Sequence, residues 1–399
     1  MKRKLSLTAQ IAISFVLGIL GGLLLQSNSA IADSYIRPLG TIYLNLLKMI
    51  VIPVVTLSVI QGIMALQDAK RVGALGGKTL LFFLCTTAFA VAIGLLLANL
   101  FHVGVGYTME TGDLTDTPAQ MPALTDTLVN IFPSNILKPF AEGTMLQILV
   151  IALLFGFGIL LAGEKGETAA LVVDSFATVS FRVMDLILRL SPIGVFALIL
   201  PVVAQQGTGV LLPLMQVIFV SFVAYLLHML LVYGTAVSLI GKSNPFRFFK
   251  EMGKPILFAF SSASSVGTLP FSMEATEKLG VSKSLSGFVL PLGATVNMDG
   301  TAIYQGVCVI FIAHIFGVEL TLAQQLTVVL TALLASIGTA GVPGSGMVML
   351  AMVLQSVGLP VEGIALVAGV DRILDMGRTV VNITGDCACC LCVTPKKGI

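Results

Sequence analysis

The residues best suited to chemistry lie close together near the C-terminus, where charged side chains interrupt an apolar sequence. A helix, at about 100° per residue, would carry the polar residues of this segment on one stripe: Asp371, Asp375, Arg378, Thr379, Asn382 and Asp386. Charges in apolar surroundings are costly unless they pair or bind an ion. We interpret the stripe as one wall of an ion and substrate site. A structural ion pair is the simpler alternative, but it would leave part of the acidic charge unneutralised.

The composition places this stripe in a membrane protein. Hydrophobic residues make up 56% of the 399-residue chain, charged residues make up 11%, and the mean hydropathy is +1.01. These values lie outside the usual range of soluble domains. The apolar runs are ~20 residues long, which predicts spanning helices rather than the strands of a barrel. The net charge of +2 is scattered, so we expect no nucleic-acid partner.

Apolar stretches long enough to cross a bilayer precede residue 244. They cover residues 7–25, 43–66, 79–101, 145–162, 169–203 and 210–240. Lysines and arginines flank them mainly on one side, which predicts that both termini are cytoplasmic in a multi-pass protein of the plasma (inner) membrane. The three histidines belong to no recognisable motif, so we expect them to be packing or loop residues.

Beyond residue 244, the apolar runs are interrupted by small polar residues in two matching sets. The first set is 261–270, followed by a span broken at 297–301; the second is 336–346, followed by the charged helix. Backbone leaves the helix at membrane depth only where protein or water satisfies it, and paired interruptions of this kind indicate a transporter binding site. We expect two re-entrant hairpins, each paired with a span. Two kinked spanning helices are the alternative.

The interrupted segments offer oxygen atoms for a monovalent cation. Asp299 with Asn297, and Asp386 with Asn382, form pairs of a carboxylate and an amide. Unwound carbonyls and the ends of half-helices supply further oxygen ligands in such sites. We therefore expect sodium as the coupling ion and no other cofactor.

The charged helix also predicts the ligand. Arg378 has the planar fork that matches a carboxylate, and Asp375, one turn earlier, would meet an ammonium group. Ser264 and Ser265, with the amides of the hairpin tip, could hold a second carboxylate. A dicarboxylic amino acid meets all of these demands.

Four motifs in this order give the chain a family resemblance. They are the serine cluster at 261–265, NMDGT at 297–301, SIGTAGVPG at 336–344 and DxxxDMGRTxxN at 371–382. The sequence resembles the glutamate transporter homologues, or sodium:dicarboxylate symporters, which include archaeal aspartate transporters and animal excitatory amino acid transporters. The resemblance covers nearly the whole chain.

The resemblance implies an all-α fold of eight transmembrane helices and two re-entrant hairpins, built as inverted repeats. It implies a homotrimer in the lipid bilayer that works by an elevator movement. Residues 1–75 and 106–205 would form a fixed scaffold, the latter with an extracellular loop, and residues 76–105 and 206–399 would form the mobile transport domain.

The resemblance also implies roles for single residues. The substrate would be held by Arg378 with Thr301, Asp375 with Thr379, Asn382 with Ser265 and Ser264, and a lid at Val342 and Gly346. Three sodium sites are implied. The first would use Asp386, Gly293, Asn297 and Asn382, and the second would use Asp299, Asn297, Met298, Thr86 and Thr87. The third would use Thr295, Ser336, Ile337 and Thr339. Asp371 would support the site without touching substrate.

Two positions separate this chain from parts of the family. Gln305 stands where animal members have a proton-coupled glutamate, which predicts coupling to sodium alone. Arg372, beside Asp371, stands in place of the arginines that other family members carry at other positions.

We expect a sodium-coupled importer of aspartate or glutamate, and no enzyme. A carrier of neutral amino acids would leave Arg378 uncompensated, and a carrier of four-carbon dicarboxylates would leave Asp375 unpaired. An intramembrane aspartyl protease is the remote alternative.

Overall fold

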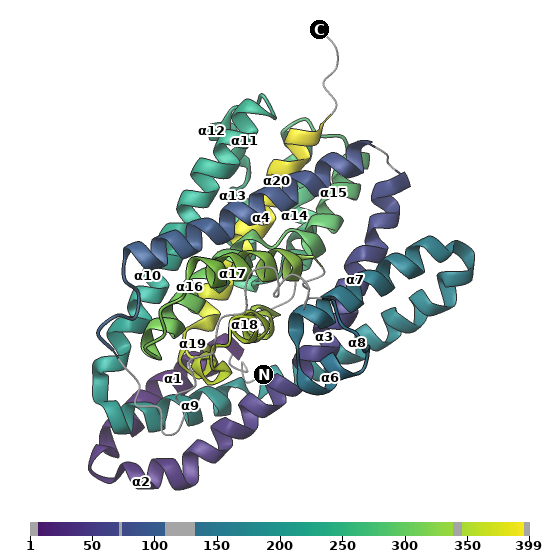
Figure 1. The fold of residues 1–399 in the computed structure, drawn as a ribbon. Helices are drawn as coiled ribbons and strands as arrows, with labels where there is room; N and C mark the ends of the chain where they lie inside the picture. Colours follow the sequence, from purple (N-terminus) through teal and green to yellow (C-terminus); the bar gives the residue numbers. More distant parts are fainter. Residues whose placement is uncertain (1–6, 72–73, 108–131, 338–344, 395–399) are drawn as a thin grey trace, which may run out of the picture.

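The computed structural model describes residues 7–71, 74–107, 132–337 and 345–394, and these ranges are helical with no strand (Figure 1). The first part contains α1 (Leu7–Leu24), η1 (Gln26–Asn28), α2 (Ser29–Ile31), η2 (Ala32–Ile36), α3 (Arg37–Arg71), α4 (Ala74–Leu100), α6 (Lys138–Glu142), α7 (Met145–Ala162), η3 (Gly163–Gly166), α8 (Glu167–Arg189), α9 (Ser191–Gln206) and η4 (Gly207–Val210). The second part contains α10 (Leu211–Leu227), η5 (His228–Tyr233), α11 (Gly234–Leu239), α12 (Pro245–Glu251), α13 (Gly253–Ser262), α14 (Ser265–Lys278), α15 (Lys283–Val296), α16 (Asp299–Ile315), α17 (Leu322–Ser336), α18 (Ser345–Ser356), η6 (Val361–Gly363), α19 (Ile364–Ala368) and α20 (Asp371–Val393).

Several helical stretches have the length and apolar composition of membrane spans. Within the described residues they are Gln26–Met64, Leu75–Leu100, Gln147–Arg189, Leu211–Leu239 and Lys283–Ile315. Large apolar side chains such as Leu81, Phe89 and Leu161 are mostly exposed on these stretches. Contiguous apolar surface of this kind suits contact with lipid. The prediction of a multi-pass helical membrane protein is confirmed.

One expected span is divided in the structure. The stretch 169–203 was predicted as a single span, but α8 ends at Arg189 and α9 begins at Ser191, with Pro192 in its first turn. Proline lacks a backbone N–H and therefore begins a helix more readily than it continues one. Helix α9 then packs along α1, and the Ser191 hydroxyl lies 2.9 Å from the Tyr43 hydroxyl of α3. The prediction of one continuous span was wrong.

Two pairs of short helices lie where the sequence predicted hairpins. Helices α13 and α14 contact each other and have 10 and 14 residues, and α17 and α18 contact each other and have 15 and 12 residues. All are shorter than the ~20 residues that a spanning helix needs. Between α13 and α14 the chain turns at Ala263, whose φ of 52° is left-handed, and Ser264 caps α14.

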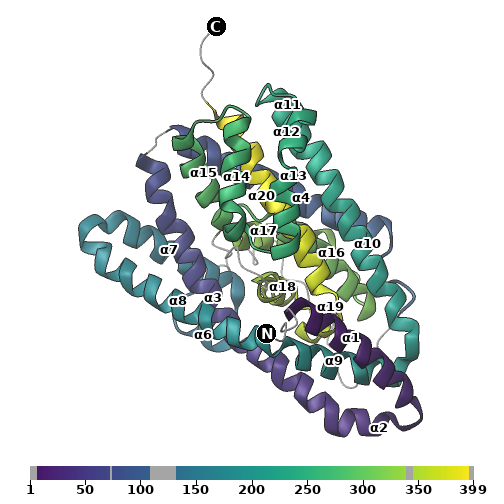
Figure 2. The same ribbon diagram turned by 180° about the vertical axis from the view of Figure 1, so that it is seen from behind.

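The span that carries NMDGT is also interrupted as predicted. Helix α15 ends at Val296, Asn297 has an extended backbone, and α16 begins at Asp299. Helix α20 contacts α13, α14, α15 and α16, and both views show it running through the middle of this group (Figures 1 and 2). The charged helix is thus enclosed by protein, which explains why its polar face does not meet lipid.

Candidate functional site

Helix α20 carries the polar stripe that the sequence predicted. The side chains buried along it include Asp371, Asp375, Arg378, Thr379, Asn382 and Asp386. The helix extends without interruption from Asp371 to Val393, so the spacing of these residues places them on one face. The predicted wall of charged and amide groups is confirmed as a geometric feature.

Arg378 is the centre of one end of this wall. Its Nε donates to Asp375 Oδ1 at 2.8 Å, and its Nη1 donates to Asp371 Oδ1 at 3.3 Å. The Cζ atom lies 4.6 Å from the centroid of the Tyr304 ring. The Nη2 atom lies 2.8 Å from Asp375 Oδ1 but outside hydrogen-bond geometry, and it donates to no acceptor among the described residues. A buried guanidinium nitrogen without an acceptor can receive a ligand carboxylate.

Asp375 is shared between two arginines. Besides Arg378, the Arg372 Nη1 atom donates to Asp375 Oδ2 at 3.3 Å, from a side chain that is 21% exposed. The carboxylate that we expected to bind a substrate ammonium is therefore occupied by guanidinium groups in this structure. A ligand ammonium would have to displace the more exposed partner, Arg372.

A small cavity adjoins these charges. It has a volume of about 50 Å³ and is bordered by Asp371, Arg372 and Asp375 of α20 and by Tyr43 and Ser191. A water molecule occupies about 30 Å³ of liquid volume, so this space suits water rather than an amino acid. A substrate that binds beside Asp371 and Asp375 would need more space than this cavity offers.

Glycines allow the backbone to approach the arginine. A Cβ atom added at Gly346, in the first turn of α18, would meet the Arg378 guanidinium, and one added at Gly300 would meet the Arg378 carbonyl. The Gly300 N–H donates to Asn382 Oδ1 at 2.8 Å. Helices α18 and α16 therefore approach α20 closely beside Arg378. Val342, the other expected lid residue, lies outside the described residues.

A second group of polar atoms surrounds Asp386, two turns beyond Arg378. Asn297 Nδ2 donates to Asp386 Oδ1 at 2.9 Å and to the Asn382 carbonyl at 3.2 Å. Asn297 Oδ1 is buried and has no hydrogen-bond partner among the described residues. An added Cβ at Gly293 would meet the Asp386 carboxylate. This arrangement leaves an oxygen acceptor facing the protein interior, where an alkali cation could satisfy it.

Asp299 forms a third polar group next to these. Its Oδ1 accepts from the Thr87 hydroxyl at 2.6 Å, and its Oδ2 accepts from the Tyr233 hydroxyl at 2.7 Å. His228 Nε2 lies 3.1 Å from the same Oδ2. The side chains of Asp299 and His228 are fully buried. The prediction that His228 is only a packing residue was wrong, because it contacts the carboxylate of a candidate ion site.

The comparison with protein families identifies the class of protein to which this chain belongs. The sequence pattern described as the sodium:dicarboxylate symporter family matches residues 7–395. The chain belongs to the sodium:dicarboxylate symporter family. Members of this family are symporters, so the chain is a transporter and not an enzyme. The predicted family and class are confirmed.

Curated relatives within the sodium:dicarboxylate symporter family differ in the substrates that their names give. A proton/sodium-glutamate symport protein of Bacillus caldotenax is 38% identical, covering 99% of this chain and 96% of the relative. A proton/glutamate-aspartate symporter of Escherichia coli K12 is 37% identical, covering 96% and 91%. A C4-dicarboxylate transport protein of Ralstonia nicotianae is 37% identical, covering 90% and 85%.

The remaining substrate residues expected from this symporter family are close to the wall but bond locally. The Thr379 hydroxyl donates to the Asp375 carbonyl at 2.8 Å, and the buried Thr301 hydroxyl lies 4.0 Å from Met298 Sδ. Ser265 is buried in the first turn of α14, and the Ser264 hydroxyl accepts from the Gly267 N–H at 3.1 Å. These roles remain predictions.

The third expected sodium set is not brought together by contacts of the described residues. The Thr295 hydroxyl donates to the Leu292 carbonyl, and the Ser336 hydroxyl donates to the Leu333 carbonyl. Ile337 is the last described residue of its segment, and Thr339 lies outside the described residues. Met298 contributes its sulfur, 3.2 Å from Asn382 Nδ2, between the substrate and sodium groups.

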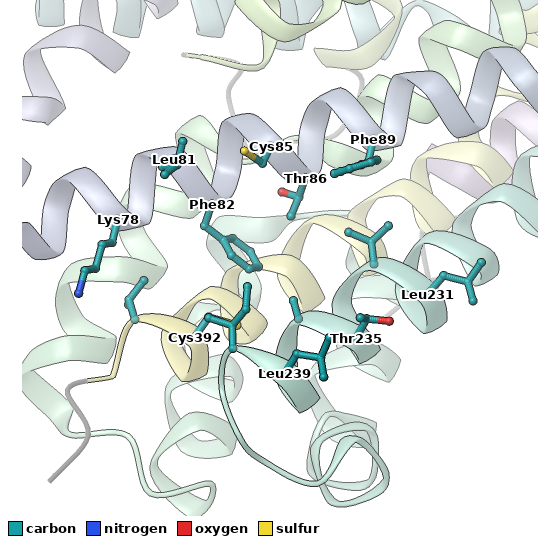
Figure 3. A pocket seen from close by; sticks show the side chains of 14 residues that line it. Lys78, Leu81, Phe82, Cys85, Thr86, Phe89, Leu231, Thr235, Leu239 and Cys392 are labelled. Carbon is teal, nitrogen blue, oxygen red and sulfur yellow. The ribbon is translucent and has the colours of Figure 1, made fainter. Parts of the chain in front are cut away.

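Thr86 faces a different space from its neighbour Thr87. Its hydroxyl donates to the Phe83 carbonyl at 3.2 Å, and it borders an apolar groove of about 580 Å³ between α4, α11 and the end of α20 (Figure 3). Leu81, Phe89 and Leu231 line the same groove. The largest cavity among those described therefore lies on the apolar side of α4, away from Arg378, and does not mark the substrate site.

The sequence contained one signal that indicated a functional role for the residues around His228. His228 and Tyr233 stand inside the apolar stretch 210–240, and an ionisable side chain at membrane depth indicates a functional site by default. What the sequence could not supply was the partner, because η5 and Asp299 of α16 meet only in the folded protein.

Proposed function

We propose that this chain imports an acidic amino acid, aspartate or glutamate, together with sodium. The observation that carries the proposal is the buried pair of Arg378 and Asp375, in which the Arg378 Nη2 atom makes an ion-pair contact but no hydrogen bond among the described residues. A ligand carboxylate would bind the Arg378 fork, and a ligand ammonium would bind Asp375. An amino acid with a carboxylate on its side chain satisfies both groups, whereas a neutral amino acid leaves the buried guanidinium without a counter-charge.

The binding roles that we propose follow the geometry of α20 and its neighbours. Arg378 and Thr301 would hold the side-chain carboxylate, Asp375 and Thr379 the ammonium group, and Asn382, Ser265 and Ser264 the main-chain carboxylate, beneath the lid formed by Val342 and Gly346. Support comes from α16 and α18, whose Gly300 and Gly346 lie against Arg378, and from the contacts between α14 and α20. Helices α14, α16 and α18 each begin within a predicted interruption.

Sodium would bind to the carboxylates that are not paired with a lysine or an arginine. Among the described ion pairs, no lysine or arginine contacts Asp299 or Asp386. The buried Asn297 Oδ1 atom, which has no hydrogen-bond partner in the described part of the chain, offers an acceptor between α15 and α20. Sodium prefers oxygen ligands of this kind, and its charge would balance the acidic groups.

Transport would follow an elevator movement in a homotrimer, with both termini cytoplasmic in the plasma membrane. The chain would have eight spans and two re-entrant hairpins in inverted repeats. Residues 1–75 and 106–205 would stay fixed while residues 76–105 and 206–399 move. Support comes from the packing: α1, α3, α7, α8 and α9 contact one another, while α4 packs on α16 and α20 with the hairpins.

A four-carbon dicarboxylate is the second candidate substrate. The observation that favours it is the hydrogen bond from Arg372 to Asp375. Because Arg372 already pairs with Asp375, a ligand without an ammonium group would not leave that carboxylate alone. Relatives of similar identity carry C4-dicarboxylate names. The two candidates differ in whether Arg372 stays on Asp375 or leaves it when the substrate binds.

Uptake into proteoliposomes tests the proposal. We expect labelled aspartate to enter when an inward sodium gradient is imposed, and to be competed by glutamate more strongly than by succinate or serine. Arg378→Ala should abolish uptake. Arg182→Ala, which breaks an exposed ion pair on α8, is the control and should transport normally.

Two results would contradict the proposal. Uptake driven equally well by a proton gradient in the absence of sodium would show that sodium is not the coupling ion. Stronger competition by succinate than by either amino acid would show that the substrate is a dicarboxylate. It would not contradict the proposed sodium requirement.

A further inference from the structure

Two aromatic residues contact the Asp299 carboxylate from a helix that has no expected part in the site. The Tyr233 hydroxyl donates to Asp299 Oδ2 at 2.7 Å, and His228 Nε2 lies 3.1 Å from the same oxygen. Both side chains are fully buried, and their rings meet edge to face with centroids 4.7 Å apart. Asp299 Oδ2 is thus held from one side by two rigid rings.

The local backbone explains how both rings reach one oxygen. His228 and Tyr233 are the first and last residues of η5, a π-helical segment inserted between α10 and α11. Residues five apart on an α-helix point about 140° away from each other. The wider π turn, closed by i to i+5 hydrogen bonds, brings them to the same side, and such turns occur often at functional sites.

The other oxygen of Asp299 has a different environment. Asp299 Oδ1 accepts only from the Thr87 hydroxyl, at 2.6 Å, among the described contacts. A hydroxyl that donates its proton keeps lone pairs on its oxygen. Asp299 Oδ1 and Thr87 Oγ1 therefore form an adjacent pair of oxygen atoms that can both face a cation, while Oδ2 faces the rings.

We propose that His228 and Tyr233 are positioning residues for a sodium site at Asp299. By fixing Oδ2, they hold the carboxylate in the one orientation that presents Oδ1 and the Thr87 oxygen to the ion. Neither ring touches the ion. The inference rests on the proposed function, because it requires that Asp299 binds sodium.

The test is the sodium concentration that half-saturates aspartate binding to the purified, full-length protein in lipid nanodiscs. Tyr233→Phe, which removes a single oxygen, and His228→Leu should each raise this concentration about tenfold or more, as expected for loss of a hydrogen bond to a charged group. His228→Gln keeps an N–H donor and should recover most of the loss. The aspartate dissociation constant at saturating sodium should change by less than about threefold, since the substrate groups are untouched.

Tyr225→Phe is the matched control. Tyr225 is equally buried, lies on α10, and has a hydroxyl without a hydrogen-bond partner among the described residues. It should leave the sodium constant unchanged. An unchanged sodium constant in Tyr233→Phe overturns the inference, as does an equal shift in Tyr225→Phe. If His228→Leu does not fold, Tyr233→Phe decides alone.

The failure of the inference can be told from the failure of the proposed function. If sodium is not the coupling ion, the wild-type protein itself binds aspartate without regard to sodium. If only the positioning role is wrong, the wild type depends on sodium and the two variants keep its sodium constant.

Discussion

Buried charges are compensated differently in two regions along α20, one around Arg378 and the other around Asp299 and Asp386. Around Arg378, two arginines face two aspartates, and every carboxylate has a guanidinium partner within 3.3 Å. Around Asp299 and Asp386, the described partners are a hydroxyl pair, an imidazole and an amide. The first region is balanced by side chains alone, whereas in the second the carboxylates have no lysine or arginine partner among the described ion pairs, so a bound cation would balance them.

Because of this difference, we expect one region to bind the substrate and the other to bind a cation. A balanced region can accept a zwitterionic ligand by exchanging one ion pair for another, so it suits the substrate. A region with an excess of carboxylates attracts a metal cation and becomes less costly when the cation is present. Since the two regions share α20 and Asn382, we expect that occupancy of one affects the other.

The largest effect that would sharpen this comparison is the loss of Arg378. Arg378→Ala leaves Asp371 and Asp375 with Arg372 alone, and removal of one partner of a buried charged pair costs about 3–5 kcal/mol. We expect aspartate uptake to fall below detection, and the protein to unfold at a lower temperature. Uptake assays and thermal unfolding of the purified protein measure the two effects. Normal uptake by Arg378→Ala would show that the balanced region does not hold substrate.

Loss of a carboxylate at the other end should act on sodium. Asp386→Asn keeps the shape of the side chain but removes the charge that attracts a cation, so the half-saturating sodium concentration should rise at least tenfold, or by about 1.4 kcal/mol. Sodium titrations of aspartate binding measure this. Asp185→Asn, on the exposed face of α8, is the control. An unchanged sodium constant would place the ion elsewhere.

Two glycine substitutions separate the regions with the same chemical change. Gly346→Ala would push against the Arg378 guanidinium, and Gly293→Ala would push against the Asp386 carboxylate. Overpacking of this kind costs about 1–3 kcal/mol. We expect the first variant to weaken aspartate binding about tenfold and the second to weaken sodium binding about tenfold. Gly287→Ala, where an added Cβ meets no atom within 4 Å, should do neither. Identical defects in both variants would contradict the separation.

The smallest effect concerns Arg372. Arg372→Ala frees one oxygen of Asp375 for a ligand ammonium, and a partly exposed ion pair contributes up to about 1 kcal/mol. The preference for aspartate over succinate should therefore increase about fivefold in competition assays. A shift toward succinate would show that Arg372 helps to bind amino acids and does not compete with them.

The sequence was sufficient wherever one segment carried its own signal. The stripe on α20, the break at Asn297 and the turn at Ala263 each follow from local spacing and residue type. The resemblance also named Gly346, and the structure places this residue against Arg378.

The sequence was insufficient wherever two distant segments meet. Nothing in the stretch 210–240 indicates that η5 lies against Asp299, more than 60 residues away. Nor can adjacent threonines on α4 be told apart, since a rotation of one residue decides that Thr87 meets Asp299 while Thr86 lines the apolar groove. The division between α8 and α9 was missed because the apolar composition continues across Ser191 and outweighed the proline signal.

The most direct measurement is the aspartate dissociation constant at a series of sodium concentrations. If the region around Asp299 and Asp386 requires a cation before the region around Arg378 accepts substrate, binding should tighten steeply as sodium rises, with potassium giving no such effect. An aspartate dissociation constant that stays the same from sodium-free buffer to high sodium would contradict the coupling of the two regions.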